Sequence, residues 1–222
     1  MRDCCIIFFI KYPEKGKIKT RLAKDINEDF VLNLYRCFVI DILSVLNKLK
    51  FDFKIYFDPP GSLIKIKKWL GENYTFVQQR GSDLGERMKN AFESVFEEDY
   101  NKAIIIGSDM PCFSCDFFSD IFDELGDNHT VIGPSPDGGY YLLGFKKDTF
   151  LKEVFYDIHW STENVLSSTM KIFNKYKYKV NILEVMNDID TFDDLRDFFY
   201  KNKNSDFKNS NTMKYILKSK IF

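Results

Sequence analysis

The sequence predicts an α/β domain whose mostly parallel sheet is covered by helices on both faces. Apolar runs alternate with amphipathic stretches along the chain, and the connections between them are short. Such alternation is typical of parallel strands joined by helical crossovers. The 222 residues contain no internal repeat and no interior low-complexity linker, so one domain is expected over residues 1–200.

Strands are expected where short apolar or alternating runs are bounded by turn residues. These runs lie at residues 4–10, 51–57, 74–78, 102–107, 130–134, 140–145 and 179–185. Helices are expected where apolar residues recur at helical spacing, at 28–49, 62–70, 83–97, 116–125, 161–176 and 191–200. Asp83, Ser161 and Thr191 are the expected helix starts, with Glu86 and Asp194 in capping-box positions after two of them.

The C-terminal segment, residues 201–222, has a different composition. Lys, Asn and Ser dominate it up to Met213, and a short amphipathic stretch, 213–222, closes the chain. We interpret this segment as a polar linker followed by a possible docking helix.

Composition narrows the class of protein. Hydrophobic residues make up 45% of the chain, enough to build a sizeable core. The formal net charge of −1 gives no overall attraction to nucleic acid or to an anionic membrane, so neither is an expected partner. The apolar run 4–10 is too short to span a bilayer and lacks the features of a signal peptide, which predicts a cytoplasmic protein with reduced cysteines.

Cys112 and Cys115 form an isolated Cys-x-x-Cys pair. No second pair with zinc spacing accompanies it, and His129 and His159 stand alone. We therefore interpret the two thiols as incidental residues at the start of a helix.

A basic loop follows the first expected strand. Pro13 and Gly16 keep the segment out of a helix, while Lys11, Lys19 and Arg21 bring positive charge to one strand end. Backbone amides, a lysine and an arginine fork are what a di- or triphosphate needs, although a solvated basic turn fits the composition equally well. The spacing is not that of a Walker A loop.

A second loop bracketed by glycines, 79–88, runs into a helix whose first amides can hold a phosphate or a base edge. Arg80 and Arg87 can add charge there. An ordinary capped helix with surface ion pairs is the alternative.

Asp109 is the sharpest metal-ligand candidate. The buried run 102–107 ends in Gly107, Ser108 and Asp109, so the carboxylate is presented at the carboxyl edge of the sheet, where such sheets bind ligands. Mg²⁺ is commonly held by one or two carboxylates together with phosphate oxygens. A turn or helix-capping aspartate is the alternative.

Three further segments lie at the same expected edge. The turn 133–144 contains Asp137 and the pair Tyr140–Tyr141, which suits either a plain hairpin or the wall of an acceptor pocket. Residues 159–162 include Trp160, which can line that pocket or be a buried structural residue. Asp188 and Asp190 face one way in an extended segment, so either can oppose Asp109 across a metal; helix capping is the alternative.

In this order, the segments resemble the nucleotide-diphospho-sugar transferase superfamily (the GT-A fold). They are more closely similar to a bacterial family of glycosyltransferases, some of them associated with arsenosugar biosynthesis. The resemblance covers about residues 4–200. The matching motifs are Lys11-x-Pro13-x-x-Gly16-x-x-Lys19-Thr20-Arg21-Leu22, Gly81-x-Asp83-Leu84-Gly85-Glu86-Arg87-Met88, Gly107-Ser108-Asp109-Met110-Pro111, Gly133-Pro134-x-x-Asp137-Gly138-Gly139-Tyr140-Tyr141, Trp160-Ser161-Thr162 and Asp188-x-Asp190-Thr191.

The resemblance implies a single three-layer α/β/α domain with one reversed strand and a site for Mg²⁺ or Mn²⁺ held by Asp109 and Asp190. It implies nucleotide contacts from Lys11, Gly16, Lys19, Arg21, Gly81, Asp83, Gly85, Arg87 and Ser108. It implies an acceptor side formed by Gly138, Gly139, Tyr140, Trp160, Ser161 and Thr162. Asp137, Lys19 and Arg21 are the expected catalytic residues. Cys112 and Cys115 depart from the polar or acidic residues that relatives commonly carry after this aspartate motif.

The expected activity is metal-dependent transfer of a group from a nucleotide sugar to a small-molecule acceptor. One alternative is a nucleotidyltransferase, similar to the guanylyltransferases that act on phospholactate or molybdopterin, which releases pyrophosphate from a nucleoside triphosphate. Another is a nucleotide-binding module without catalysis. The base, the sugar, the acceptor and the oligomeric state are left open.

Overall fold

The computed structural model describes residues 2–222, apart from the side chain of Arg2, and contains a seven-stranded sheet in the order β3-β2-β1-β4-β6-β5-β7. β6 runs antiparallel to both of its neighbours, and the other pairings are parallel. The α/β class and the single reversed strand are therefore confirmed. The strands are β1 (Arg2–Lys11), β2 (Asp52–Asp58), β3 (Phe76–Gln78), β4 (Tyr100–Ile106), β5 (Thr130–Pro134), β6 (Tyr140–Lys146) and β7 (Val180–Ile182).

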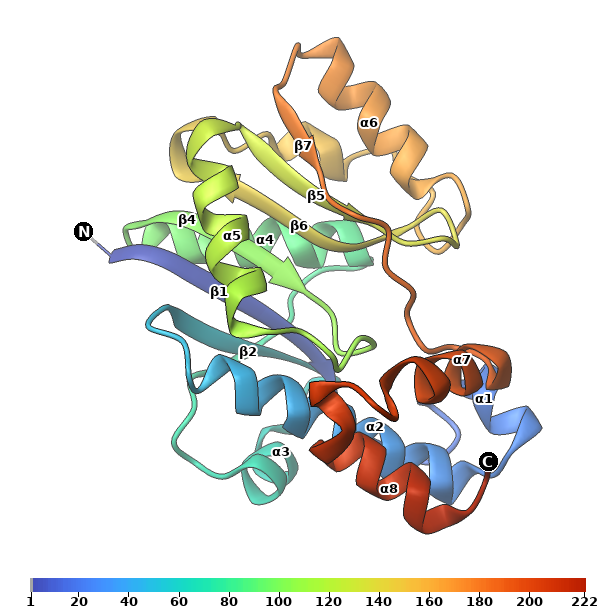
Figure 1. Cartoon of the computed structure of the whole chain (residues 1–222). Helices are drawn as coiled ribbons and strands as arrows, with labels where there is room; N and C mark the ends of the chain where they lie inside the picture. The colour runs from blue at the N-terminus through green and yellow to red at the C-terminus, as the bar shows by residue number, and fades with distance from the viewer. Residues whose placement is uncertain (1) are drawn as a thin grey trace.

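Helices cover both faces of the sheet (Figure 1). They are α1 (Thr20–Asp25), α2 (Glu28–Leu46), α3 (Leu63–Leu70), α4 (Leu84–Glu97), α5 (Cys115–Asp127), α6 (Val165–Lys175), α7 (Phe192–Asn202) and α8 (Asn211–Ser219). Residues 2–222 also contain three short 3-10 helices, η1 (Lys147–Thr149), η2 (Lys152–Phe155) and η3 (Asp206–Asn209).

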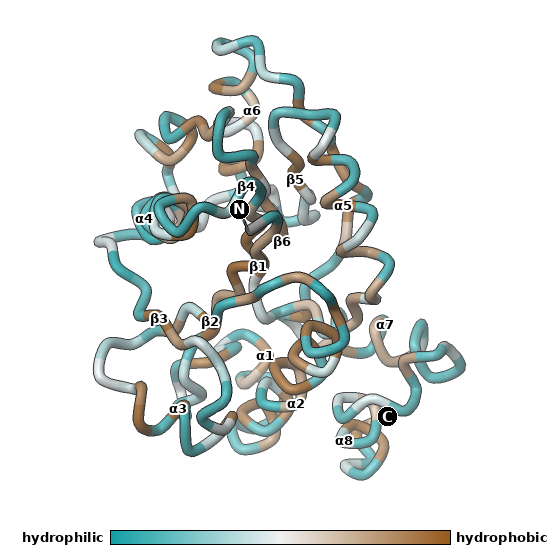
Figure 2. Tube along the Cα trace, turned by 90° about the vertical axis from the view of Figure 1, so that its left-hand side faces the viewer, coloured by the Kyte–Doolittle hydropathy of each residue, from teal (hydrophilic) through white to brown (hydrophobic). Residues whose placement is uncertain are grey.

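Alternation along β1 explains the layers. Ile6 and Phe8 point into a core cluster shared with α2, α3 and α5, whereas Cys5 and Ile7 point into a second cluster shared with α4, α6 and η2. All four side chains are fully buried. Figure 2 shows α4 on one side of the apolar strands β1, β4 and β6, and α5 on the other. Because β1 is apolar on both faces, it occupies the middle of the sheet.

A third cluster lies outside the sheet and includes the C-terminal segment. Met213 and Ile216 of α8 pack with Val31, Leu34 and Phe38 of α2. The carboxylate of Asp41 in α2 accepts hydrogen bonds from the backbone amides of Asn211 (2.9 Å) and Thr212 (2.8 Å). The helix expected in this segment is thus present and docked, while the division of the chain at residue 200 stays a prediction.

Several element boundaries differ from the sequence expectation. α1 was not expected, because its six residues are too few for a helical period to show. The helix expected from 161 begins at Val165, since Ser161 adopts a left-handed conformation (φ 64°) that cannot start a helix. The strand expected at 179–185 is reduced to three residues, because only 180–182 pair with β5.

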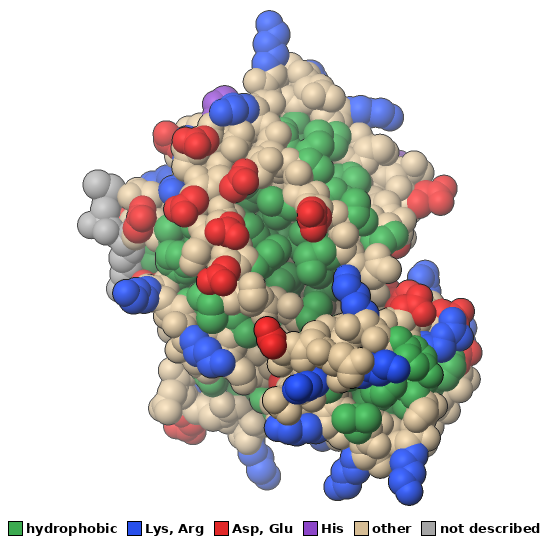
Figure 3. Space-filling view, viewed as in Figure 1, with side chains coloured by type: hydrophobic (Ala, Val, Ile, Leu, Met, Phe, Trp, Pro, Cys, Tyr) green, Lys and Arg blue, Asp and Glu red, His purple; other side chains and the backbone are tan. Residues whose placement is uncertain are grey.

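The surface seen in Figure 3 separates charges by region. Acidic side chains gather over α5, where Asp116, Asp120, Asp123, Glu124 and Asp127 are exposed. Lys and Arg side chains predominate on the lower part of the same face, over α2, α3 and α8. Within residues 2–222, no helix combines the length and the apolar character needed to cross a membrane.

Candidate active site

A cavity of about 940 Å³ opens at the carboxyl edge of β1 and β4 and reaches the β5–β6 turn. The predicted site residues that line it are Lys11, Lys19, Arg21, Arg87, Ser108, Asp109, Asp137, Gly139, Tyr140, Trp160, Ser161, Thr162 and Asp190. Both expected sides of the site, nucleotide and acceptor, therefore border one cavity. The predicted residues outside its lining are Gly16, Gly81, Asp83, Gly85 and Gly138.

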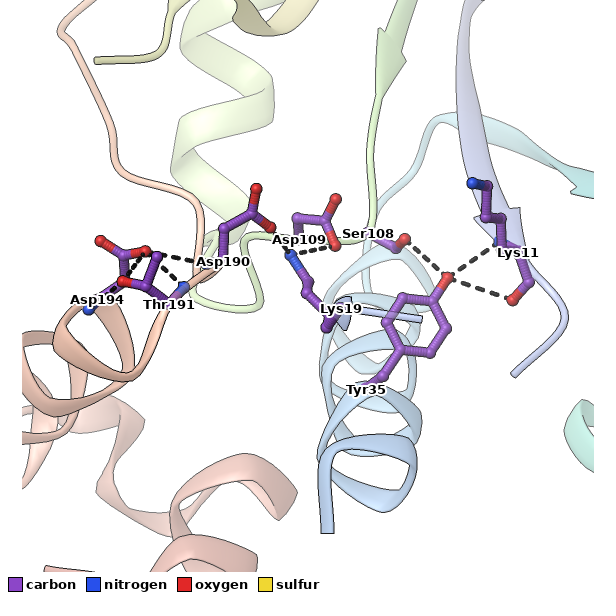
Figure 4. Close-up of polar contacts among 8 residues, drawn as sticks. All are labelled: Lys11, Lys19, Tyr35, Ser108, Asp109, Asp190, Thr191 and Asp194. Atoms are coloured by element: carbon purple, nitrogen blue, oxygen red, sulfur yellow. Dashed lines mark hydrogen bonds and ion pairs between the residues drawn. The ribbon is translucent and has the colours of Figure 1, made fainter. Parts of the chain in front are cut away.

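The ammonium group of Lys19 lies between the two carboxylates that were expected to hold a metal (Figure 4). Lys19 Nζ is 2.6 Å from Asp109 Oδ1 and 2.7 Å from Asp190 Oδ1. The lysine side chain is 4% exposed, whereas the aspartates are 47% and 40% exposed. Burial opposes the charged form of Lys19, but the two carboxylates outweigh it and raise the lysine pKa above its usual value.

The basic loop is held so that Lys19 must point inward. Ile18 is buried in the cluster around α2 and α5, and Leu22 is buried in the cluster around α7 and α8. Between these anchors, Lys19 itself adopts a left-handed conformation (φ 47°, ψ 49°) immediately before α1. Left-handed backbone is uncommon for a residue with a side chain, so the loop is held by its flanking anchors.

The loops that carry the two aspartates are joined through the backbone. Ile189 is buried, and its amide donates to the carbonyl of Asp109 at 3.3 Å. Asp190 immediately precedes α7, whose start is fixed by the reciprocal capping box of Thr191 and Asp194. The carboxylates thus reach the cavity from rigid supports, and the predicted helix cap is confirmed.

Asp188 belongs to the same acidic group. Burial and the neighbouring charge of Asp190 raise its pKa to about 6, and Lys19 opposes the rise. Asp137 and Asp109 contribute further in the same direction, which shows that four carboxylates share this region of the cavity. A cation at this place would relieve their mutual repulsion.

Ser108, predicted as a nucleotide contact, is buried and takes part in a tyrosine-centred network. The Tyr35 hydroxyl is 2.9 Å from Ser108 Oγ, accepts from the Lys11 amide at 2.9 Å and lies 3.2 Å from the Lys11 carbonyl. Burial raises the pKa of Tyr35 well above its usual value, so the phenol stays protonated. This network fixes the end of β1 against the end of β4.

The second loop is ordered by its own hydrogen bonds. Asp83 caps α4 by accepting from the Glu86 amide at 2.8 Å, as expected. The Glu86 carboxylate accepts hydrogen bonds from the backbone amide and the hydroxyl of Ser82, so it does not complete a capping box with Asp83. Arg87 Nε donates to the Gly81 carbonyl at 3.2 Å, and its Nη1 lies 3.3 Å from Asp58. The arginine is therefore already engaged with protein groups at the wall of the cavity.

Trp160 joins the two sides of the cavity. Its indole lies over Gly85, where a Cβ atom would come within 2.3 Å of the ring. Tyr140 meets the same indole edge to face, with ring centroids 6.5 Å apart. A Cβ on Gly138 would come within 2.0 Å of the Glu163 carbonyl oxygen, so the β5–β6 turn packs directly on the segment after Trp160. Close packing thus leaves no room for a side chain at Gly85 or at Gly138.

Asp137, the predicted catalytic base, is exposed in the β5–β6 turn and borders the cavity. One of its carboxylate oxygens accepts from the Gly139 amide at 3.0 Å. The other oxygen has no hydrogen bond to the part of the chain that the structure describes. Its position suits contact with an acceptor, and its catalytic role stays a prediction.

Gln79 lines the cavity and was not singled out from the sequence. Its side-chain amide nitrogen donates to the carbonyls of Tyr56 (2.9 Å) and Ile10 (3.3 Å), which ties β3 to the ends of β1 and β2. A buried glutamine at a strand end was the available signal. That signal is weak, because glutamine is also common on exposed loops.

The donor set at Asp109 and Asp190 fits a divalent cation. Each carboxylate has one oxygen on Lys19 and a second oxygen without a hydrogen bond to residues 2–222. In that range, no group of three or more His, Cys, Asp or Glu side chains forms a ready metal site. Two carboxylates completed by ligand phosphate oxygens are a common arrangement for Mg²⁺, so these residues fit the expected ion.

The fold and the site define a protein of the nucleotide-diphospho-sugar transferase fold class. The chain belongs to the family described as uncharacterized protein conserved in bacteria (DUF2064), whose model matches residues 42–162. A candidate nucleotide-diphospho-sugar transferase from Desulfovibrio desulfuricans G20 has a similar crystal structure. It is 39% identical, with a TM-score of 0.95, and the match covers 99% of this chain and 96% of that one.

Two further relatives are more distant. A 2-phospho-L-lactate guanylyltransferase from Methanocaldococcus vulcanius is 26% identical over 87% of this chain and 84% of its own. A Mycobacterium tuberculosis protein whose crystal structure is described as a complex with manganese shares the fold. It has a TM-score of 0.52 and 14% identity, and the match covers 89% of this chain and 97% of that one. At the coarse level, these relatives place the chain among transferases.

Proposed function

We propose that the chain is a nucleotidyltransferase, which joins a nucleoside monophosphate unit to a small phosphorylated acceptor and releases pyrophosphate. The observation that carries this proposal is the set of cationic side chains that β1 and the loop after it bring to the cavity. Lys11, Lys17, Lys19 and Arg21 all line it, close to the exposed carboxylates of Asp109 and Asp190. A triphosphate supplies enough negative charge to match such a cluster.

The family resemblance favoured glycosyl transfer, whereas Lys19 and Arg21 of the basic loop already suited a triphosphate, and the residues that line the cavity strengthen the second interpretation. Lys17 and Lys19 pair with carboxylates, but Lys11 and Arg21 also line the cavity and have no ion pair with residues 2–222. A triphosphate offers them more phosphate oxygens than a sugar nucleotide, which carries only two phosphates. Similarity to a guanylyltransferase over most of both chains supports the same choice.

Glycosyl transfer is the second candidate. It is favoured by the relative from Desulfovibrio desulfuricans, which is described as a candidate nucleotide-diphospho-sugar transferase and is 39% identical to this chain. In that reaction, the bond between the sugar and the phosphate breaks and a nucleoside diphosphate is released. The two reactions therefore differ in their phosphate product.

In the proposed reaction, a phosphate oxygen of the acceptor attacks the α-phosphorus of the nucleoside triphosphate. The bond from that phosphorus to the oxygen bridging the α- and β-phosphates breaks, and pyrophosphate leaves. Lys11 and Arg21 bind the phosphate oxygens and stabilise charge that builds up on the leaving group. A divalent cation held by Asp109, Asp190 and phosphate oxygens would supply Lewis-acid stabilisation of the same charge.

The acceptor enters from the side of the β5–β6 turn. Asp137, Tyr140 and Trp160 border the cavity beside that turn. The carboxylate of Asp137 orients a hydroxyl or ammonium group of the acceptor, and the aromatic pair shields the reaction from water.

The test begins with a thermal-shift screen of ATP, CTP, GTP, UTP and their diphospho-sugars, each with and without Mn²⁺. A ligand that binds only the folded state raises the unfolding temperature. The best triphosphate is then incubated with phosphorylated acceptors, including 2-phospho-L-lactate, and pyrophosphate is measured. We expect stabilisation by a triphosphate and release of pyrophosphate.

Other outcomes would support the two competing functions, glycosyl transfer and nucleotide binding without catalysis. Stabilisation by a diphospho-sugar and release of a nucleoside diphosphate would establish glycosyl transfer. Binding of nucleotide without turnover on any acceptor in the panel would favour the non-catalytic module. Absence of metal-dependent nucleotide binding would overturn all transfer reactions considered for this cavity.

A further inference from the structure

Lys19 lies where a bridging cation would lie. Its ammonium nitrogen is 2.6 Å from Asp109 Oδ1 and 2.7 Å from Asp190 Oδ1, so it takes one oxygen from each carboxylate (Figure 4). Mg²⁺ binds oxygen ligands at about 2.1 Å. An ion bound to the same two oxygens would therefore be in contact with the ammonium nitrogen.

Two cations cannot share that position. Like charges at contact distance repel strongly, and the lysine side chain is only 4% exposed, so water does not screen it well. A divalent ion on these two oxygens therefore requires Lys19 to move away, and an ion on the two free carboxylate oxygens would still lie close enough to the ammonium to be repelled by it.

The backbone that carries the two carboxylates is fixed. The Ile189–Asp109 backbone hydrogen bond holds their loops together, and the capping box of α7 fixes the backbone at Asp190. Lysine, in contrast, carries its charge on a flexible four-carbon stem. The group that moves is therefore the ammonium.

We propose that Lys19 is a resident counter-ion which a divalent cation displaces, and that the released ammonium then binds a nucleotide phosphate. The second step rests on the proposed function, and the first does not. The exchange keeps the charges of Asp109 and Asp190 compensated both before and after the metal arrives. It also makes metal binding weak until a phosphate is present to accept the lysine.

The decisive measurement is binding of Mn²⁺ alone, without nucleotide, followed by the electron paramagnetic resonance signal of the free ion. Lys19→Met removes the competing charge and keeps the apolar stem. We expect it to bind Mn²⁺ at least about tenfold more tightly than the natural protein, because a contact-distance positive charge has been removed.

Lys15→Met is the matched control. Lys15 belongs to the same loop but pairs with Asp29 at 2.7 Å and does not line the cavity. It removes the same net charge, so we expect its Mn²⁺ affinity to stay within about twofold of the natural protein. Equal affinities for Lys19→Met and the natural protein, or equal gains in both variants, would overturn the exchange.

A second measurement uses the unaltered protein, in case Lys19→Met does not fold. An amine-acylating reagent, with the products mapped by mass spectrometry, should label Lys19 slowly when no metal is added. Millimolar Mn²⁺ should increase labelling of Lys19 relative to Lys15, and GTP or CTP added with Mn²⁺ should protect it again. Unchanged labelling with Mn²⁺ bound would overturn the displacement. Labelling that persists after nucleotide binds would overturn the phosphate step alone.

Discussion

At the residue scale, the site is organised around carboxylates that a strand end and a helix start bring together. Asp109 was predicted from the buried run that precedes it, whereas the spacing left Asp188 and Asp190 equally open and the family resemblance selected Asp190. The structure places both within hydrogen-bond distance of one lysine, 171 residues away from Asp190 along the chain. Spacing could not predict that contact, because it depends on how the chain folds around α7.

Asp109→Asn should abolish most of the activity while leaving the fold intact. The substitution removes the charge that holds the metal, but Asp190 still pairs with Lys19. We expect turnover to fall at least about 100-fold and the free energy of unfolding to fall by about 1–3 kcal/mol, because the buried Lys19 keeps only one of its two carboxylate partners. Pyrophosphate release and urea denaturation measure the two effects.

The control for that substitution is Asp193→Asn. Asp193 is 74% exposed and pairs with Arg196 on the surface of α7, so activity should be unchanged. If Asp109→Asn retains metal-dependent nucleotide binding and turnover, the assignment of Asp109 is wrong.

Tyr35→Phe should reduce stability, because it removes the centre of a buried network. The Lys11 amide and Ser108 lose their partner, and a buried unsatisfied polar group costs about 1–3 kcal/mol. Tyr56→Phe is the matched control, since that hydroxyl makes a long 3.5 Å bond to the Ala91 carbonyl and a contact with the Ser94 side chain, and it joins no pair of strand ends. Urea denaturation of both variants should show a larger loss for Tyr35→Phe. Equal losses would show that the network contributes no special stability.

At the element scale, the helix ends show what local sequence can and cannot predict. The Thr191–Asp194 box and the Asp83 cap depend on residues three apart, so the pattern was visible in the chain. Ser161 has the right residue type for a cap, but packing of Glu163 against Gly138 holds the segment in a turn. Long-range packing, which one sequence does not reveal, decided that boundary.

The Asp41 carboxylate of α2 holds the first turn of α8, and Asp41→Ala should free that turn. Asp41 satisfies the first backbone amides of α8, which have no partner within the helix. We expect a loss of about 1–3 kcal/mol and faster amide hydrogen exchange in α8. Asp29→Ala changes an exposed acidic residue of the same helix and should cost under about 0.5 kcal/mol. Unchanged exchange in α8 after Asp41→Ala would show that apolar packing alone holds this helix.

The packing of Trp160 over α4 predicts an unusual effect of Gly85→Ala. Alanine normally stabilises a helix relative to glycine, but here its Cβ would lie 2.3 Å from the indole. We expect the tryptophan to move, with a loss of about 1–3 kcal/mol and weaker nucleotide binding. Intrinsic tryptophan fluorescence and denaturation report the two changes.

Gly126→Ala is the control for Gly85→Ala, because it is also a helical glycine. Its Cβ would meet only the flexible end of Lys102 at 3.4 Å, so this variant should be neutral or slightly more stable. If both alanine variants behave alike, the indole is not in contact with α4 in solution.

At the scale of the whole molecule, the site lies where three core clusters meet. Ile18 and Met110 belong to the first, Met88 and Leu143 to the second, and Leu22 and Ile189 to the third. The sequence predicted the sheet and its two covering layers, because their periodicity is local. It did not predict the third cluster, since Leu22, Phe38 and Met213 give no sign in the sequence that they pack together.

The third cluster makes the C-terminal segment part of the structure that supports the site, and a truncation after Lys203 tests this. The deletion removes Met213 and Ile216, which are fully buried against Val31, Leu34 and Phe38. Loss of one large buried side chain costs about 2–5 kcal/mol, so the deletion should cost more than about 4 kcal/mol. The same cluster holds Leu22 beside Lys19 and Ile189 beside Asp190, so Mn²⁺-dependent nucleotide binding should weaken as well.

Met213→Ala should show a milder form of both effects, and Leu217→Ala, at a position 57% exposed, should show neither. Urea denaturation and nucleotide titration distinguish this outcome from that of a self-sufficient domain at residues 1–200. Such a domain would keep both its stability and its nucleotide affinity after the deletion.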